Sequence, residues 1–212
     1  MRPFLAWPLD RLGLIDISLD QQLLWVARTQ GHTPAVERKV ARFSLLGEHA
    51  GIWLVLGAAE SLLRTGTRRS RWIRATSVVA GTYGLNTALK LAVRRVRPQL
   101  PGLPALTSTP TRFSFPSAHS STSFAAALAY SRAGFPARPL YALAGGLALS
   151  RLYLGVHYPS DVLAGALLGT AVAAACTPRA DASDATVAAC TRGALPTGTS
   201  NGAITLDGAA AL

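Results

Sequence analysis

Five long, mostly apolar runs limit the folds open to this chain more than any other feature. They span residues 43–63, 75–93, 117–133, 139–156 and 162–176. Each is about 15 to 21 residues long, close to the ~20 residues that a helix needs to cross the hydrocarbon core of a bilayer. Ala and Gly recur in them, as in membrane helices that pack closely. The sequence therefore predicts an all-α fold, an integral membrane helical bundle of about five transmembrane helices.

The remaining segments predict the organisation around this bundle. Half of the 212 residues are hydrophobic and only 15% are charged, which suits one small membrane domain at 43–177. Residues 14–26 alternate apolar and polar side chains, which predicts an amphipathic interfacial helix within an N-terminal segment at 1–42. Residues 178–212 are rich in Thr, Asp, Ser, Gly and Ala and predict a disordered tail. The first 14 residues lack a small-residue cleavage site, so we expect no cleaved signal peptide.

The charge balance and the cysteines limit the partners. The formal net charge is +11, but the basic residues stand between apolar runs rather than along one helix face. We therefore expect a membrane and phosphate-bearing lipids as partners, and no nucleic acid. Cys176 and Cys190 suggest neither a disulfide framework nor a thiolate metal site. Gly165 and Gly169 have the spacing of a helix-dimer motif, which more often serves packing within one chain, and the oligomeric state stays open.

Polar residues gather at the ends of the apolar runs in three clusters. The clusters are Lys90 with Arg97 and Pro98, then Pro116-Ser117-Ala118-His119, then Ser150-Arg151 with His157 and Asp161. Each alone has an ordinary explanation: a Lys at a helix end anchors at the interface, Pro-Ser starts a helix, and a single His packs. Together they predict a site, because charges inside membranes are costly.

The residue types in these clusters suit a phosphate group. Lys90, Arg97 and Arg151 are the cations that a phosphate dianion requires. The amides near Ser117 and Ala118 would point at a bound anion from a helix N-terminus, and the Ser117 hydroxyl can add a donor.

The histidine motifs add a chemical group to this pocket. Pro159 after His157 favours a new helix start, so that Asp161 in its first turn can fold back to the imidazole. One histidine can be a neutral nucleophile while another is a protonated acid, since histidine titrates near neutral pH.

The combined string, Lys-x6-Arg-Pro, Pro-Ser-Ala-His and Ser-Arg-x5-His-x3-Asp, resembles the phosphatidic acid phosphatase type 2 superfamily, which includes vanadium-dependent haloperoxidases. The resemblance covers residues 90–161. In that family the middle motif normally reads Pro-Ser-Gly-His, so Ala118 departs from the pattern; Ala keeps the amide but restricts its dihedrals.

The resemblance implies a membrane phosphatase that needs no cofactor and no metal. It implies that His157 attacks phosphorus to form a phosphohistidine and that Asp161 holds the other ring nitrogen. It also implies that His119 protonates the leaving alkoxide and then activates water. The implied phosphate-binding residues are Lys90, Arg97, Ser117, Ala118 and Arg151.

Two other functions and several substrates stay open. The alternatives are a haloperoxidase-like vanadate-binding protein, against which the apolar runs argue, and a non-catalytic phosphate-binding scaffold, which would not need all of His119, His157 and Asp161. The substrate could be a polyprenyl phosphate or diphosphate, a polyprenyl-linked sugar phosphate, phosphatidic acid or phosphatidylglycerol phosphate. Residues 43–49, Phe-Ser-Leu-Leu-Gly-Glu-His, look similar to small bacterial members, including those that act on decaprenyl-phosphoryl-phosphoribose.

The loops also suggest which side the site faces. The motifs lie on one side of the bundle, and seven arginines occupy the other: Arg64, Arg68, Arg69, Arg71, Arg74, Arg132 and Arg138. Because cytoplasmic loops carry the excess of positive charge, we expect an extracytoplasmic site in a bacterial cell membrane. Arg94, Arg95 and Arg112 flank the site and are assigned to headgroup attraction or interfacial anchoring rather than catalysis. Four polar residues within the runs could line a pocket: Glu48, His49, Glu60 and Asn86.

Overall fold

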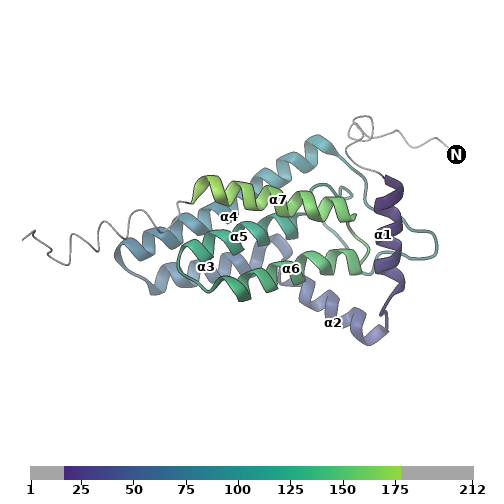
Figure 1. Cartoon of the computed structure of the whole chain (residues 1–212), viewed down its shortest axis with the longest axis horizontal. Helices are drawn as coiled ribbons and strands as arrows, with labels where there is room; N and C mark the ends of the chain where they lie inside the picture. The colour runs from purple at the N-terminus through teal and green to yellow at the C-terminus, as the bar shows by residue number, and fades with distance from the viewer. Residues whose placement is uncertain (1–16, 178–212) are drawn as a thin grey trace, which may run out of the picture. The chain divides into compact units, whose positions relative to one another are not determined.

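The computed structural model describes residues 17–177, which fold mainly into helices (Figure 1). They are α1 (Ile17–Thr29), α2 (Pro34–Leu45), a short 3-10 turn η1 (Glu48–Ala50), α3 (Gly51–Leu63), α4 (Gly66–Val93), α5 (Ala118–Arg132), α6 (Ala137–Tyr153) and α7 (Pro159–Cys176). In this part of the chain, β-type pairing is limited to two isolated bridges in the loop before α5. The predicted all-α class is therefore confirmed, whereas the predicted tail and Cys190 lie outside the described residues.

Helix α5 forms the centre of the bundle, in contact with α3, α4, α6 and α7. Its small residues allow this, because seven Ala and Ser residues between Ser120 and Ala129 are buried and the helix is covered on nearly all sides. On α7, a Cβ at Gly169 would lie 1.9 Å from the Ser121 carbonyl oxygen, and one at Gly165 would lie 2.6 Å from that of Ser117. The glycine pair of α7 therefore packs against α5 of the same chain.

Aromatic side chains fill the other side of α5. The Trp53 indole donates to Ser123 Oγ at 2.9 Å, and the Tyr130 hydroxyl donates to the Trp53 carbonyl at 2.7 Å. The Trp72 and Tyr130 rings lie 5.0 Å apart. Because buried Trp and Tyr have their polar atoms bonded, they pack here without an unsatisfied donor.

Two predicted helix boundaries are wrong. The run 43–63 is not one helix, since α2 ends at Leu45 and α3 begins only at Gly51. Between them His49 and Ala50 adopt left-handed backbone conformations, with φ of 50° and 59°. The predicted helix at 75–93 omits its first part, since α4 already starts at Gly66. The arginines of 68–74 are good helix formers, and their side chains reach solvent.

The expected number of about five spans is not confirmed by helix length and composition. Among the described helices, only α7, with 18 residues, is both long enough and apolar enough to cross a bilayer. Helices α3 and α5 have 13 and 15 residues. A helix, α1, does form within the segment where an amphipathic interfacial helix was expected; it contacts α6 and α7 and lies across one end of the bundle in Figure 1, and its place at a membrane interface stays a prediction.

Candidate active site

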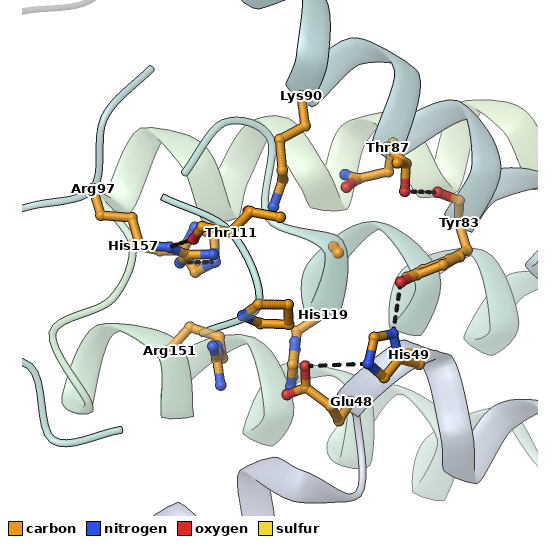
Figure 2. A pocket seen from close by; sticks show the side chains of 13 residues that line it. Glu48, His49, Tyr83, Thr87, Lys90, Arg97, Thr111, His119, Arg151 and His157 are labelled. Carbon is orange, nitrogen blue, oxygen red and sulfur yellow. Dashed lines mark hydrogen bonds and ion pairs between the residues drawn. The ribbon is translucent and has the colours of Figure 1, made fainter. Parts of the chain in front are cut away.

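The three predicted clusters meet at the end of the bundle near α1. Lys90 lies in the last turn of α4, Ala118 and His119 begin α5, Arg151 lies near the end of α6, and His157 lies just before α7. These residues and Arg97 line one pocket of about 110 Å³ (Figure 2). The structure thus brings together six of the eight predicted site residues along a single cavity.

The loop at 94–117 forms one wall of this pocket and is irregular, as its prolines predict. It is held by backbone pairing: Arg97 N–H donates to the Arg112 carbonyl at 3.2 Å, and Ser114 N–H donates to the Arg95 carbonyl at 2.7 Å. The Arg97 guanidinium donates through Nε to the Thr111 carbonyl and through Nη1 to the Val156 carbonyl, each at 2.8 Å. These bonds fix Arg97 beside His157.

Three cations, Lys90, Arg97 and Arg151, face the pocket without a carboxylate partner, and Arg97 is half-buried. Lys90 and Arg151 are 8% and 4% exposed. Within residues 17–177, none of Lys90, Arg97 and Arg151 has a carboxylate oxygen within 4.0 Å. Arg151 donates to Ser44 Oγ at 2.7 Å, while its Nε has no hydrogen-bond partner in this part of the chain. Buried charges are stable only when compensated, so this arrangement suits a multiply charged anion.

The hydrogen bonds of His157 fix its tautomer. Arg97 Nη1 lies 3.1 Å from His157 Nε2, and a guanidinium can only donate, so Nε2 is the unprotonated nitrogen. The proton therefore lies on Nδ1, which is 3.5 Å from Asp161 Oδ2. That distance is short enough for electrostatic attraction but longer than a hydrogen bond, and Nδ1 has no hydrogen-bond partner among the described residues. Burial, followed by the charges of Arg97, Arg151 and Lys90, lowers the pKa of His157 well below 6.5.

His119 is oriented by the end of α2. Its Nε2 lies 2.9 Å from the Ser44 carbonyl oxygen, which can only accept, so Nε2 carries a proton. Nδ1 is then the nitrogen that can gain and lose a proton. The ring lies tightly against Gly47, where a Cβ would be 2.6 Å from His119 Cδ2. Ser44 thus holds both His119 and Arg151, a role that the sequence did not indicate.

Ser117 is not among the residues that line the pocket. It is fully buried as the N-cap of α5, where its Oγ accepts from Ser120 N–H at 3.4 Å and from Ser120 Oγ at 3.2 Å. In this structure Ser117 therefore caps helix α5. The residues of the first turn of α5 that face the cavity are Ala118 and His119.

Asp161 is held from behind by a buried ionic network that the sequence did not predict. Arg95 Nη1 donates to Asp161 Oδ1 and Arg95 Nη2 donates to Asp20 Oδ2, each at 2.8 Å. Asp20 also accepts from Ser160 N–H at 3.0 Å, and the Tyr158 amide donates to Asp161 Oδ2 at 2.9 Å. The Arg95 guanidinium stacks on the Tyr158 ring at 4.1 Å. Arg95, which was assigned to the interface, therefore supports Asp161 instead.

A spacing signal for this network does exist in α1. Asp20, Leu24 and Arg28 recur every four residues and are 5%, 0% and 4% exposed, so they share the inward face. Arg28 donates to the carbonyls of Tyr153 at 3.1 Å and Pro104 at 2.8 Å. Because α1 has charged residues on its buried face, an apolar-periodicity criterion misses that face.

The chain is similar to several known proteins. Residues 71–183 match the family model described as PAP2 superfamily. The chain is 41% identical over 150 residues to a decaprenylphosphoryl-5-phosphoribose phosphatase of Mycolicibacterium smegmatis (strain ATCC 700084 / mc(2)155), covering 69% of this chain and 80% of the relative. It is 40% identical over 131 residues to the protein of that name from Mycobacterium tuberculosis (strain ATCC 25618 / H37Rv), covering 62% and 73%.

Two solved structures share the fold. One is described as the first transmembrane PAP2 type phosphatidylglycerolphosphate phosphatase from Bacillus subtilis, with a TM-score of 0.61, 23% identity and coverage of 74% of this chain and 82% of that one. The other is Aquifex aeolicus LpxE, with a TM-score of 0.59, 23% identity and coverage of 76% and 95%. At these identities the likeness concerns the fold.

Proposed function

Since this chain belongs to the PAP2 superfamily and is a lipid phosphate phosphatase, we propose that it removes the terminal phosphate of a polyprenyl-linked sugar phosphate, namely decaprenylphosphoryl-5-phosphoribose. The relatives with that activity in their names are about 40% identical over most of their length. Phosphatidic acid, phosphatidylglycerol phosphate and polyprenyl phosphates or diphosphates are the competing substrates.

One observation carries the catalytic proposal: a buried histidine with an unprotonated Nε2 lies among three cations that have no carboxylate partner. In the proposed reaction His157 Nε2 forms a bond to phosphorus as the bond to the ester oxygen breaks. Arg97 must then exchange His157 Nε2 for a phosphoryl oxygen. Lys90, Arg97 and Arg151, with the amides at Ala118 and His119, stabilise the charge on the equatorial oxygens.

The proposed proton transfers involve His119. Protonated at Nδ1, it donates that proton to the leaving alkoxide. The neutral imidazole then takes a proton from water, whose oxygen attacks the phosphohistidine and releases inorganic phosphate with His157 restored. Asp161 stabilises the positive charge that develops on His157, and Arg95 keeps Asp161 ionised and in place.

A membrane location is proposed for the bundle as a whole. Large apolar side chains lie exposed on several helices, including Val55 (71%), Leu62 (78%), Leu149 (63%) and Leu167 (63%). Exposed apolar surface of this kind suits contact with lipid. We propose that α3 to α7 cross a bacterial cell membrane and that the pocket end, with α1 along the interface, faces the outside. The arginines of 64–74, 132 and 138 would then lie on the cytoplasmic side.

A phosphate-release panel on purified protein in detergent tests this function. Decaprenylphosphoryl-5-phosphoribose should give the highest kcat/KM when compared with phosphatidic acid, phosphatidylglycerol phosphate and polyprenyl diphosphate. Because the mechanism assigns charge stabilisation to side chains and amides, EDTA should leave turnover intact, and vanadate should compete with substrate. A higher kcat/KM for another lipid would refute the substrate, and loss of turnover in EDTA with recovery in Mg²⁺ would refute the mechanism.

A further inference from the structure

The wall of the pocket opposite His157 contains a carboxylate that a phosphate site would not be expected to keep. Glu48 and His49 line this wall together with Tyr83, Asn86 and Thr87 (Figure 2). The Glu48 side chain is 30% exposed, and its partner in the described structure is His49, whose Nε2 lies 3.9 Å away. Since like charges repel, Glu48 disfavours a phosphate dianion in the same cavity. Glu48 also helps to compensate the charges of Arg151, Arg97 and Lys90, and its two accepting oxygens on the pocket wall are suited to a further binding task.

The backbone is arranged to present Glu48 and His49 to this wall. Helix α2 stops at Leu45, and His49 and Ala50 both adopt left-handed conformations before α3 begins. Neither residue is glycine, so the conformation is unfavourable for both, and such strain is usually retained only where neighbouring contacts enforce it. Here Gly47 packs against the His119 ring. The break therefore places Glu48 beside the residue that is proposed to protonate the leaving group.

The polar groups on this wall match hydroxyl groups. An ionised carboxylate only accepts hydrogen bonds, and its two oxygens can accept from two adjacent hydroxyls. His49 Nδ1 lies 2.7 Å from the Tyr83 hydroxyl, which fixes the imidazole beside Glu48. Tyr83 and His49 can each donate or accept, depending on tautomer. The wall thus combines one charged acceptor with two adaptable partners.

We infer that Glu48, supported by His49 and Tyr83, binds the hydroxyl groups of a sugar leaving group. This inference rests on the proposed function and deepens it, because it assigns the recognition of the alcohol to particular side chains. The cations bind the phosphoryl group, and the carboxylate binds the vicinal diol of the sugar that the phosphoryl group leaves. A leaving alcohol without free hydroxyls gains nothing from Glu48 and retains the repulsion between its phosphate and the carboxylate.

A pair of synthetic substrates isolates this interaction. Octyl ribofuranoside 5-phosphate and its 2,3-dideoxy analogue have the same phosphate ester and the same alkyl chain, and differ only in the two hydroxyls. The measured quantity is the ratio of their kcat/KM values with full-length protein in detergent. The wild type should prefer the hydroxylated compound by about ten- to a hundredfold, the range expected for one or two hydrogen bonds to a charged group.

Glu48→Gln should reduce this ratio by about tenfold, because it removes the charge at nearly constant shape. The matched control is Glu60→Gln, since Glu60 pairs with Arg64 at 2.8 Å near the far end of α3 and should leave the ratio unchanged. Tyr83→Phe, which removes one hydroxyl from the wall, provides a second variant and should also lower the ratio.

Three outcomes overturn the inference: no preference in the wild type, a ratio unchanged in Glu48→Gln, or, if Glu48→Gln is inactive, a ratio unchanged in Tyr83→Phe. The proposed function fails separately, if the wild type releases phosphate from neither compound or if His157→Ala releases it normally.

Discussion

At the residue scale, the two histidines are distinguished by what they hydrogen-bond. Arg97 donates to His157 and leaves its proton on Nδ1, whereas the Ser44 carbonyl accepts from His119 and holds a proton on Nε2. The same residue type therefore presents a lone pair in one case and an exchangeable proton site in the other.

This difference predicts that the two histidines respond differently to the leaving group. His157→Ala should abolish turnover of every substrate, because no bond to phosphorus can form. His119→Ala should slow a lipid alkoxide by about 10²- to 10⁴-fold but affect p-nitrophenyl phosphate far less, since nitrophenolate leaves without protonation. Steady-state kcat with both substrates measures this. Equal losses with the two substrates would exclude His119 as the acid.

The environment of His157 predicts an unusual pH response. Burial and three neighbouring cations hold its pKa well below 6.5, so the neutral imidazole persists as the pH falls through the range where an ordinary histidine becomes protonated. In protein labelled with ¹⁵N-histidine at pH 6, the resonances that disappear in His157→Gln belong to His157. They should be those of a neutral ring. After denaturation the same label should titrate near ~6.5. A protonated His157 at pH 6 in the native protein would contradict this assignment.

At the element scale, α1 is joined to the catalytic carboxylate through Arg95. Arg95 bonds both Asp20 and Asp161, which are 5% and 0% exposed. Asp20→Asn should leave Arg95 with a single carboxylate and shift Asp161 relative to His157. We expect kcat to fall about ten- to a hundredfold while KM changes little, because misplacing a catalytic group affects the chemical step more than binding.

Two controls separate positioning from general destabilisation in this test. Gln22→Ala changes an exposed residue of the same helix and should keep wild-type kcat. Asp20→Glu keeps the charge and should recover part of the lost rate. A parallel loss of kcat and thermal stability without recovery in Asp20→Glu would show that Asp20 supports only the fold.

The α5–α7 contact depends on the absence of a side chain on α7. A Cβ at position 169 would lie 1.9 Å from the Ser121 carbonyl oxygen and 2.8 Å from its carbon. Because this obstacle is backbone, Gly169→Ala should force the helices apart and cost about 1–3 kcal/mol. Gly145→Ala on α6 is the control, since a Cβ there meets nothing within 4 Å and alanine favours the helix. Melting temperatures in detergent should separate the two; equal values would refute the tight contact.

At the scale of the whole molecule, the proposed topology predicts opposite accessibility of the two ends of the bundle. Gly102 lies in the loop before α5, and Gly66 lies at the start of α4. In a variant that lacks Cys176 and Cys190, single cysteines at these positions should react with an impermeant maleimide from opposite sides of the membrane. The protein should also stay in the pellet after carbonate washing. Labelling of both positions from one side would contradict the spans.

The sequence predicted the helical class and six of the residues that line the pocket, because periodicity and motif spacing are local properties. The polar residues predicted at the ends of the apolar runs do meet in space, among them Lys90, His119, Arg151 and His157. What the sequence did not reveal involves contacts between distant segments: at the break before α3, Gly47 packs on the His119 ring. The pairing of Arg95 with Asp20 depends likewise on where α1 lies, and no local pattern encodes that position.

Ser44, Glu48 and Asp20 all precede residue 71, where the match to the family model begins. The motif residues between Lys90 and Asp161 therefore do not form a complete site without the N-terminal part of the chain. A chimera that takes only the signature segment from one relative and the N-terminal region from another would keep every motif residue. It would still depend on the new N-terminal region to supply an acceptor for His119, a hydroxyl for Arg151 and a second carboxylate for Arg95. Over evolutionary time, the two parts of the chain are thus constrained to change together.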